Sequence, residues 1–306
     1  SANVREIIKM NGVNRKTQWM EKGMPWFFIV AASISILTTL GIVMTLVVDA
    51  SKFFVVVPLR EIFSTNLAPL RAQNPTFGFV PLLTGTLITS AIAMMVAVPI
   101  GLTAAIYLSE YATARKKKVL KPIMELLAGV PTIVYGFFAY SFVTPLLMNL
   151  IPTLNAKNAL SPGIVMGIMI IPMVTSLSED AMASVPNVMR EGSLALGTTR
   201  LETTIFVVIP SAISGIVASF ILAISRAVGE TMIVVIASGS SKNLTFDVTQ
   251  SMQTMTAYIV EFTSGDAGSG TVGYYSLYAV GLLLFLFTLG MNLFAQHIAR
   301  KYREEY

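Results

Sequence analysis

Six stretches of this sequence carry no charged residue, and each is long enough to cross a lipid bilayer. They cover residues 23–48, 72–109, 126–156, 158–178, 203–225 and 267–299. A membrane-spanning helix needs about 20 consecutive apolar residues. We therefore predict an all-α polytopic membrane protein with about six transmembrane helices, near residues 25–48, 80–108, 123–148, 162–182, 208–237 and 272–296. A barrel is excluded because its strands have only about 10 residues and alternate in polarity.

The composition excludes the other broad classes of protein. Charged residues make up 12% of the chain, against roughly 25% in a soluble domain, and the mean hydropathy is +0.72. Intrinsic disorder is excluded because it requires low hydrophobicity and high charge. The chain has no cysteine and a single histidine, His297. We therefore expect no metal site and no catalytic site that depends on cysteine or histidine.

The basic residues predict the orientation in the membrane, because Lys and Arg in short loops favour the cytoplasmic side. Five precede the first predicted span, five follow the second, two follow the fourth and three lie in the tail. The side that holds the termini therefore has 15 basic residues, and the other side has five. We expect both termini in the cytoplasm.

The spans divide the chain into a cytoplasmic segment (1–24), a first transmembrane helix (25–48), an extracytoplasmic loop (49–79), a transmembrane domain (80–296) and a cytoplasmic tail (297–306). A second long loop, 238–270, is rich in Gly, Ser and Thr, and we expect it to be either flexible or a docking surface. Gly163 and Gly167 form a G-x-x-x-G pattern, which predicts a close contact between helices. No P-loop pattern occurs, so any active transport must draw its energy from another polypeptide or from an ion gradient.

The segment 186–210, between the fourth and fifth predicted spans, has the signals of a helix, a turn and a second helix. Pro186 and Asn187 can open a short helix, and Gly197 can end it. A second helix can begin near Thr198 or Thr199 and run into the fifth span. The first helix is therefore expected to lie across the cytoplasmic face.

The spacing in this segment resembles the EAA loop of ABC importer permeases, in which Glu-Ala-Ala-x-x-x-Gly is followed after nine residues by Ile-x-Leu-Pro. Glu191 and Gly197 have the spacing of the first part, and residues 207–210 have that of the second, with Gly192 and Ser193 replacing the alanines. In that family the loop docks into a groove of the ATPase subunit and transmits its closure. The resemblance implies this coupling role for Glu191, Gly192, Ser193, Leu194, Ala195, Leu196, Gly197 and Thr198.

Further stretches resemble the phosphate-importing ABC permeases, and the PstC type more than the PstA type. They are residues 77–86, 106–112, 125–136, 178–181 and 225–232, and the similarity runs from about residue 77 to the end of the chain. The resemblance implies the type I ABC importer permease fold and alternating access in the bacterial inner membrane. It also implies four kinds of partner: a PstA-type permease in a heterodimer, two PstB-type ATPase subunits that bind ATP and magnesium, an extracytoplasmic PstS-type phosphate-binding protein, and phosphate itself. No cofactor is expected on this chain.

Arg226 and Glu230 are the predicted residues of the substrate path. Arg226 lies within the fifth predicted span, where a charged side chain costs about 2.5–3.5 kcal/mol. Glu230 follows four residues later, so in a continuous helix it lies one turn away on the same face. We expect the two charges to neutralise each other at rest and an entering phosphate to compete for the guanidinium. The alternative is an ion pair that only stabilises the helices.

Four further acidic residues lie near predicted cytoplasmic helix ends: Glu110, Glu125, Glu179 and Asp180. They are expected either to bind the basic segment 115–121, which we favour, or to help release an anion by repulsion. A sulfate or molybdate permease is the alternative within transport. A membrane enzyme or a signalling scaffold is the alternative from another class, but an enzyme would need a larger cluster of catalytic groups than Arg226 and Glu230.

Overall fold

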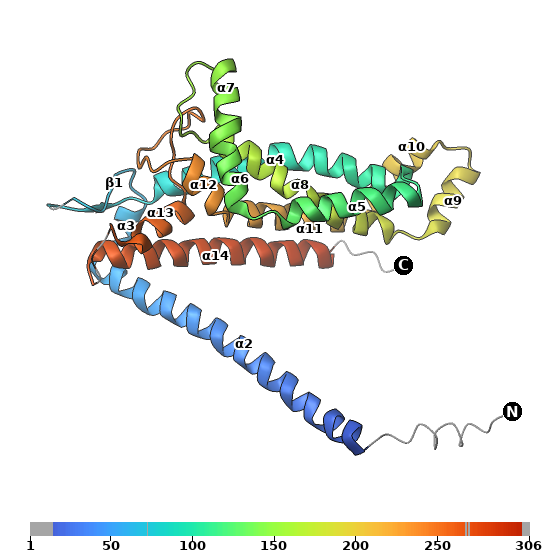
Figure 1. Cartoon of the computed structure of the whole chain (residues 1–306), viewed down its shortest axis with the longest axis horizontal. Coiled ribbons are helices and arrows are strands. Elements are labelled where there is room, and N and C mark those ends of the chain that lie inside the picture. Colours follow the sequence, from blue (N-terminus) through green and yellow to red (C-terminus); the bar gives the residue numbers. More distant parts are fainter. Residues whose placement is uncertain (1–14, 72, 267, 269, 302–306) are drawn as a thin grey trace. The chain divides into compact units, whose positions relative to one another are not determined.

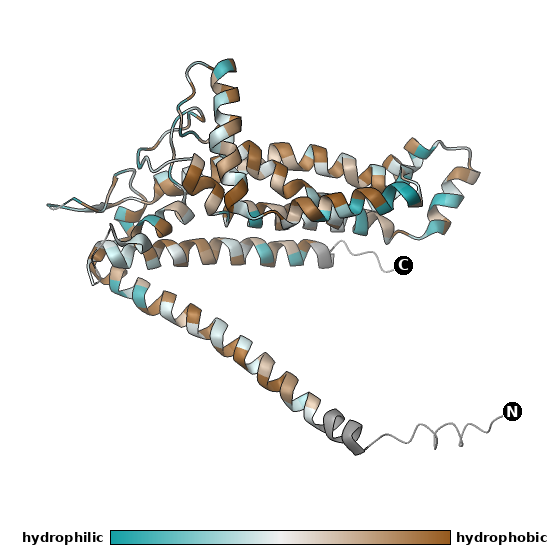
Figure 2. Cartoon of the chain, viewed as in Figure 1, coloured by the Kyte–Doolittle hydropathy of each residue, from teal (hydrophilic) through white to brown (hydrophobic). Residues whose placement is uncertain are grey.

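The computed structural model describes residues 15–71, 73–266, 268 and 270–301 of the chain (Figure 1). Within these residues, six helices are long and apolar enough to cross a membrane, which confirms the predicted all-α polytopic architecture. Hydrophobic residues predominate along them (Figure 2). Residues 1–14 and 302–306 of the predicted terminal segments lie outside the described part. The six spans are Gly23–Val56, Val80–Tyr111, Thr132–Leu150, Leu160–Ala183, Arg200–Val228 and Val272–Ile298.

The elements of the described residues follow a simple order along the chain. A short antiparallel pair of strands, with Leu67 opposite Phe77, lies in the loop between the first two spans. Four π-helical turns (η) adjoin α-helices. The elements are α2 (Arg15–Val56), α3 (Leu59–Ile62), β1 (Leu67–Ala68), β2 (Thr76–Phe77), α4 (Val80–Ile106), η1 (Tyr107–Tyr111), α5 (Ala114–Gly129), α6 (Thr132–Phe138), η2 (Ala139–Val143), α7 (Thr144–Leu150), α8 (Leu160–Ala183), α9 (Asn187–Ala195), α10 (Arg200–Thr203), η3 (Thr204–Val208), α11 (Ile209–Val228), α12 (Met232–Ala237), α13 (Met255–Glu261), η4 (Phe262–Asp266) and α14 (Val272–Lys301).

The chain divides into two compact units, Ser1–Asp49 and Ala50–Tyr306. The described part of the first unit is a continuous helix, most of α2, as expected for the span 25–48. The last turns of α2 belong to the second unit, where Phe53 is fully buried and stacks on Phe79 at a ring-centroid distance of 5.7 Å. The helix therefore continues to Val56, although a loop was predicted from residue 49, because its apolar end is part of a core.

Helices α4 and α8 approach closely along a pair of glycines. A Cβ atom on Gly163 would lie 2.7 Å from the Ile92 Cβ, and one on Gly167 would lie 2.7 Å from the Ala93 carbonyl oxygen. Both distances are too short for a real side chain. The structure thus confirms the helix contact predicted from the G-x-x-x-G pattern.

The third predicted span begins later than expected. Helix α5 ends at Gly129, Val130 is extended (φ −66°, ψ 129°), and α6 begins at Thr132. Val130 precedes Pro131, and a residue before proline is disfavoured in the α conformation. The prediction of one helix over 123–148 is therefore wrong: residues 123–129 belong to α5, and the span itself covers Thr132–Leu150.

The fifth predicted span, 208–237, is also broken. The helical run starts at Arg200 and ends at Val228, and the separate helix α12 begins only at Met232. Part of the long loop 238–270 packs back into the fold, since residues 252–258 are buried and the Met255 amide donates to the Thr86 hydroxyl at 3.0 Å. Those residues are thus neither flexible nor a docking surface, because they form part of the core.

Candidate functional site

The break between α11 and α12 is held by Glu230. Its side chain is 6% exposed, and its Oε1 accepts hydrogen bonds from the backbone amides of Met232 at 3.1 Å and Ile233 at 3.4 Å. A carboxylate at the first amides of a helix satisfies donors that have no partner within the helix and interacts favourably with its dipole. Glu230 therefore acts as a side-chain cap of α12.

The predicted relation between Arg226 and Glu230 is wrong. The prediction required a continuous helix, but α11 ends at Val228 and Glu230 lies in the break. Among the described residues, no ion pair or hydrogen bond joins Arg226 to Glu230. The carboxylate is directed to the α12 amides instead, so it does not neutralise the guanidinium at rest.

Arg226 lies in the last turn of α11, is exposed, and lines a cavity of about 240 Å³. Its position at a helix C-terminus is electrostatically favourable for a cation. The cavity wall is formed by η1, α5, α8 and α11 and contains two cations and two carboxylates among apolar side chains. The lining residues are Leu108, Lys121, Met124, Glu125, Ala128, Val130, Met169, Pro172, Met173, Ser176, Glu179 and Arg226.

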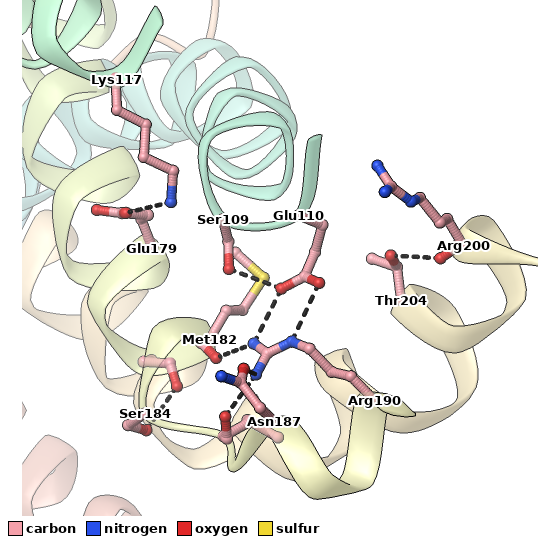
Figure 3. Close-up of polar contacts among 12 residues, drawn as sticks. Ser109, Glu110, Lys117, Glu179, Met182, Ser184, Asn187, Arg190, Arg200 and Thr204 are labelled. Atoms are coloured by element: carbon pink, nitrogen blue, oxygen red, sulfur yellow. Dashed lines mark hydrogen bonds and ion pairs between the residues drawn. The ribbon is translucent and has the colours of Figure 1, made fainter. Parts of the chain in front are cut away.

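Glu179 of α8 pairs with two lysines of α5 across this cavity. The Lys121 Nζ lies 2.6 Å from Glu179 Oε2, and the Lys117 Nζ lies 3.7 Å from Oε1 (Figure 3 shows the Lys117 contact). The Glu179 carboxylate raises the pKa of Lys121, chiefly by accepting a hydrogen bond from its ammonium group. Lys121 therefore stays charged at neutral pH. The prediction that these acidic residues bind the basic segment 115–121 is confirmed for Glu179.

The segment between α8 and α11 has the predicted helix–turn–helix form. Helix α9 follows Pro186, Gly197 adopts a left-handed conformation (φ +87°), and α10 begins after Thr199. Thr199 and Glu202 form a reciprocal capping box, in which each side chain binds the backbone amide of the other. The predicted boundaries of this loop are therefore confirmed.

Hydroxyl groups fix the turn of this loop. Ser193 Oγ lies 2.8 Å from Thr198 Oγ1 and 3.1 Å from Thr203 Oγ1, and the two threonine hydroxyls are 3.0 Å apart. Ser193 is one of the departures from the alanines of the EAA pattern, and this triangle gives its hydroxyl a structural role.

The predicted coupling residues are mostly accessible. Glu191, Gly192, Leu194, Ala195, Leu196 and Gly197 are exposed, whereas Ser193 and Thr198 are half-buried. Two large apolar side chains protrude beside them, Val188 with 78% and Leu196 with 87% of its surface exposed.

Two structural features were not found from the sequence. Arg190 of α9 binds Glu110 of η1, 80 positions earlier in the chain, with an Nη2 to Oε1 distance of 3.0 Å. Thr256, near the start of α13, donates its hydroxyl to the Glu230 carbonyl at 2.7 Å and so supports the helix break. No local pattern links either pair, so no signal in the sequence identifies them.

Comparison with known proteins gives a consistent result. The profile of the family described as "Binding-protein-dependent transport system inner membrane component" matches residues 97–304. A probable ABC transporter permease protein, YqgH, of Bacillus subtilis (strain 168) is 34% identical, with 85% of this chain and 84% of the relative aligned. The probable phosphate transport system permease protein PstC of Methanocaldococcus jannaschii is 32% identical (80% and 82% aligned). The phosphate transport system permease protein PstC of Mesorhizobium japonicum is 34% identical (74% and 75% aligned).

Solved structures resemble the chain in fold at low sequence identity. A chain of a bacterial alginate ABC transporter in complex with its periplasmic protein has a TM-score of 0.62 and 14% identity, covering 94% of this chain and 98% of that one. A chain of the MetNI methionine ABC transporter in an inward-facing conformation has a TM-score of 0.54 and 14% identity, covering 74% and 95%.

Proposed function

This chain belongs to the family of binding-protein-dependent transport system inner membrane components, the permease subunits of ABC transporters, and on that premise we propose that it translocates inorganic phosphate. It is a multi-pass inner-membrane protein with the type I ABC importer permease fold, and it is not itself an enzyme. Relatives named as phosphate permeases align over most of its length. Their names favour phosphate over the sulfate or molybdate alternative.

The observation that carries the proposal is Arg226 lining the cavity of about 240 Å³ at the end of α11. A planar guanidinium presents paired donors that match the oxygens of phosphate. One contact between unit charges at about 4 Å is worth roughly 4 kcal/mol at an effective dielectric of 20. Such a contact is strong enough to guide an anion and weak enough to release it.

The carboxylates of the cavity keep the resting charge balanced. Glu179 is 3% exposed and pairs with Lys121, so this cation is shared between a fixed carboxylate and any entering anion. Phosphate binds by competing with Glu179 and leaves as the ion pair forms again. Glu230 contributes by holding the helix break that follows Arg226, rather than by neutralising the guanidinium.

We also propose that residues 191–198 couple this cavity to an ATPase subunit. Their exposure and the protruding Val188 and Leu196 support a docking role. The full importer would then contain a PstA-type permease in a heterodimer, two PstB-type ATPase subunits that bind ATP and magnesium, and an extracytoplasmic PstS-type phosphate-binding protein. The distribution of basic residues supports cytoplasmic termini and the same location for α9.

ATP-dependent uptake of labelled phosphate by proteoliposomes that contain the complete transporter tests this proposal. We expect uptake to resist excess sulfate or molybdate, to vanish in Arg226→Gln, and to persist in the control Arg115→Gln, which removes an exposed arginine outside the cavity. Uptake that survives in Arg226→Gln would refute the phosphate path through Arg226. Uptake of sulfate or molybdate without phosphate would refute the substrate and leave the permease assignment intact.

A further inference from the structure

Arg190 joins the loop helix α9 to two other elements of the fold. Its guanidinium forms a two-point ion pair with Glu110 of η1, Nε to Oε2 at 3.2 Å and Nη2 to Oε1 at 3.0 Å. The same group donates to two backbone carbonyls, from Nη2 to Met182 in the last turn of α8 at 2.8 Å and from Nη1 to Val185 just after that helix. Figure 3 shows Arg190 extended between Glu110 and Met182. One side chain of α9 therefore binds two other elements, η1 and α8.

These polar contacts attach α9 to the transmembrane helices together with Met189, a half-buried side chain of α9 that packs against the buried apolar cluster around Met182. Within α9 no residue is fully buried, and its apolar Val188 and Leu194 are exposed. In contrast, the side chains of Arg190 and Glu110 are only 17% and 11% exposed. Water screens a pair in such surroundings weakly, so the loss of either charge has a large effect.

The two elements bound by Arg190 also form walls of the Arg226 cavity. In η1, Leu108 lines the cavity two positions before Glu110 and is 2% exposed. In α8, Glu179 lines it three positions before Met182, about one helical turn away. A π-helical turn such as η1 often occurs at a functional site. The Arg190 side chain therefore connects α9 to both walls, in addition to the short chain segment 184–186 that joins α8 to α9.

We propose that Arg190 is the positioning residue through which movement of the coupling loop reaches the substrate cavity, with Glu110 as its acceptor on η1. The inference rests on the proposed role of residues 191–198 as the ATPase-coupling loop. Contiguous networks of hydrogen bonds and rigid elements carry coupling between distant sites. Arginine suits this task because its planar fork holds two carboxylate oxygens and the Met182 carbonyl of α8 together, whereas lysine has a single ammonium group.

The test compares phosphate uptake with ATP hydrolysis in proteoliposomes that contain the complete transporter. The variants are Glu110→Gln and Arg190→Lys, with Arg115→Gln as the control for loss of an exposed charge. We expect phosphate transported per ATP hydrolysed to fall about tenfold in both variants, the size expected when one charge-assisted interaction is lost. The control is expected to keep the wild-type ratio. Co-purification of the ATPase subunits is expected to remain unchanged in all of them.

A covalent bridge separates this role from a general effect on folding. Because the chain has no cysteine, the double variant Glu110→Cys/Arg190→Cys can be joined by a short bifunctional thiol reagent. We expect it to be uncoupled when free and to recover coupling when bridged, while each single cysteine variant with the reagent stays uncoupled.

Two outcomes would overturn this proposal, and a third would overturn the proposed function on which it rests. A wild-type ratio in Glu110→Gln would overturn the proposal, and so would a bridged double variant that stays uncoupled. If the wild-type complex itself hydrolyses ATP without importing phosphate, the proposed function fails, whatever the variants do.

Discussion

Two substitutions of Glu230 separate a capping role from a charge-neutralising role. Glutamine keeps an oxygen in place of Oε1, so the amides of Met232 and Ile233 retain their acceptor. Alanine removes this oxygen and leaves both amides without a hydrogen-bond partner, at a position where the Glu230 side chain is only 6% exposed. Capping therefore predicts a mild effect for Glu230→Gln and a severe effect for Glu230→Ala.

The sizes of the two effects follow from the contacts. Glutamine loses only the interaction of a charge with the helix dipole, typically about 0.3–1 kcal/mol and at most about 2 kcal/mol. Alanine leaves the buried Ile233 amide unsatisfied, which costs about 1–3 kcal/mol, and the part-buried Met232 amide adds less because water can reach it. The alanine variant is therefore expected to be less stable than the glutamine variant by about 1–3 kcal/mol.

The assay pairs the melting temperature of the detergent-solubilised complex with phosphate uptake by proteoliposomes. We expect Glu230→Gln to keep most of the uptake and to melt close to the wild type. Glu230→Ala is expected to lose phosphate uptake and to melt at a lower temperature. If the two variants instead lose uptake equally while melting alike, the negative charge itself is required. That result would refute the capping argument and restore a direct role of Glu230 towards Arg226.

Three further predictions follow from single contacts. Gly167→Ala places a Cβ atom 2.7 Å from the Ala93 carbonyl oxygen and should lower the free energy of unfolding by about 1–3 kcal/mol, measured as a lower melting temperature. In the control Gly290→Ala the new Cβ atom meets no atom within 4 Å, so this variant should melt like the wild type. Glu179→Gln removes one of the two cavity carboxylates, so phosphate should bind more tightly and leave more slowly. Both KM and the maximal rate of uptake should therefore fall. An unchanged KM would contradict the proposed competition between phosphate and Glu179. In Gly197→Val, a β-branched residue must take a backbone φ near +87°, which side chains rarely adopt. The substitution should destabilise the loop by at least about 1–2 kcal/mol and reduce phosphate uptake. Gly197→Asn should be tolerated better, because asparagine adopts this conformation more readily.

The number and type of the membrane-spanning helices were predictable because each depends on a long continuous stretch of apolar residues. No tertiary contact is needed to recognise such a stretch, since the bilayer acts as a uniform solvent for it. The loop 186–200 was also predictable, because Pro186, Gly197 and Thr199 determine helix ends through interactions within a few residues.

The breaks inside the spans were only partly predictable. Pro131 disfavours helix at Val130 through a local steric effect, but prolines elsewhere in the spans lie inside helices, such as Pro99 in α4 and Pro172 in α8. The break at residues 229–231 contains no proline. It depends on the Glu230 carboxylate, which binds the α12 amides, and on Thr256, which binds the Glu230 carbonyl.

By itself, the sequence determined that this chain crosses the membrane about six times, carries an EAA-like loop and places one arginine deep in an apolar segment. Only the tertiary structure decided which charges meet: Glu179 with Lys121, Glu110 with Arg190, and Glu230 with backbone amides instead of Arg226. Helix ends and spans arise from neighbours along the chain, where the pattern of residues is sufficient. Ion pairs within the bundle depend on helix packing and on where helices break, and these are decided by residues distant in the sequence.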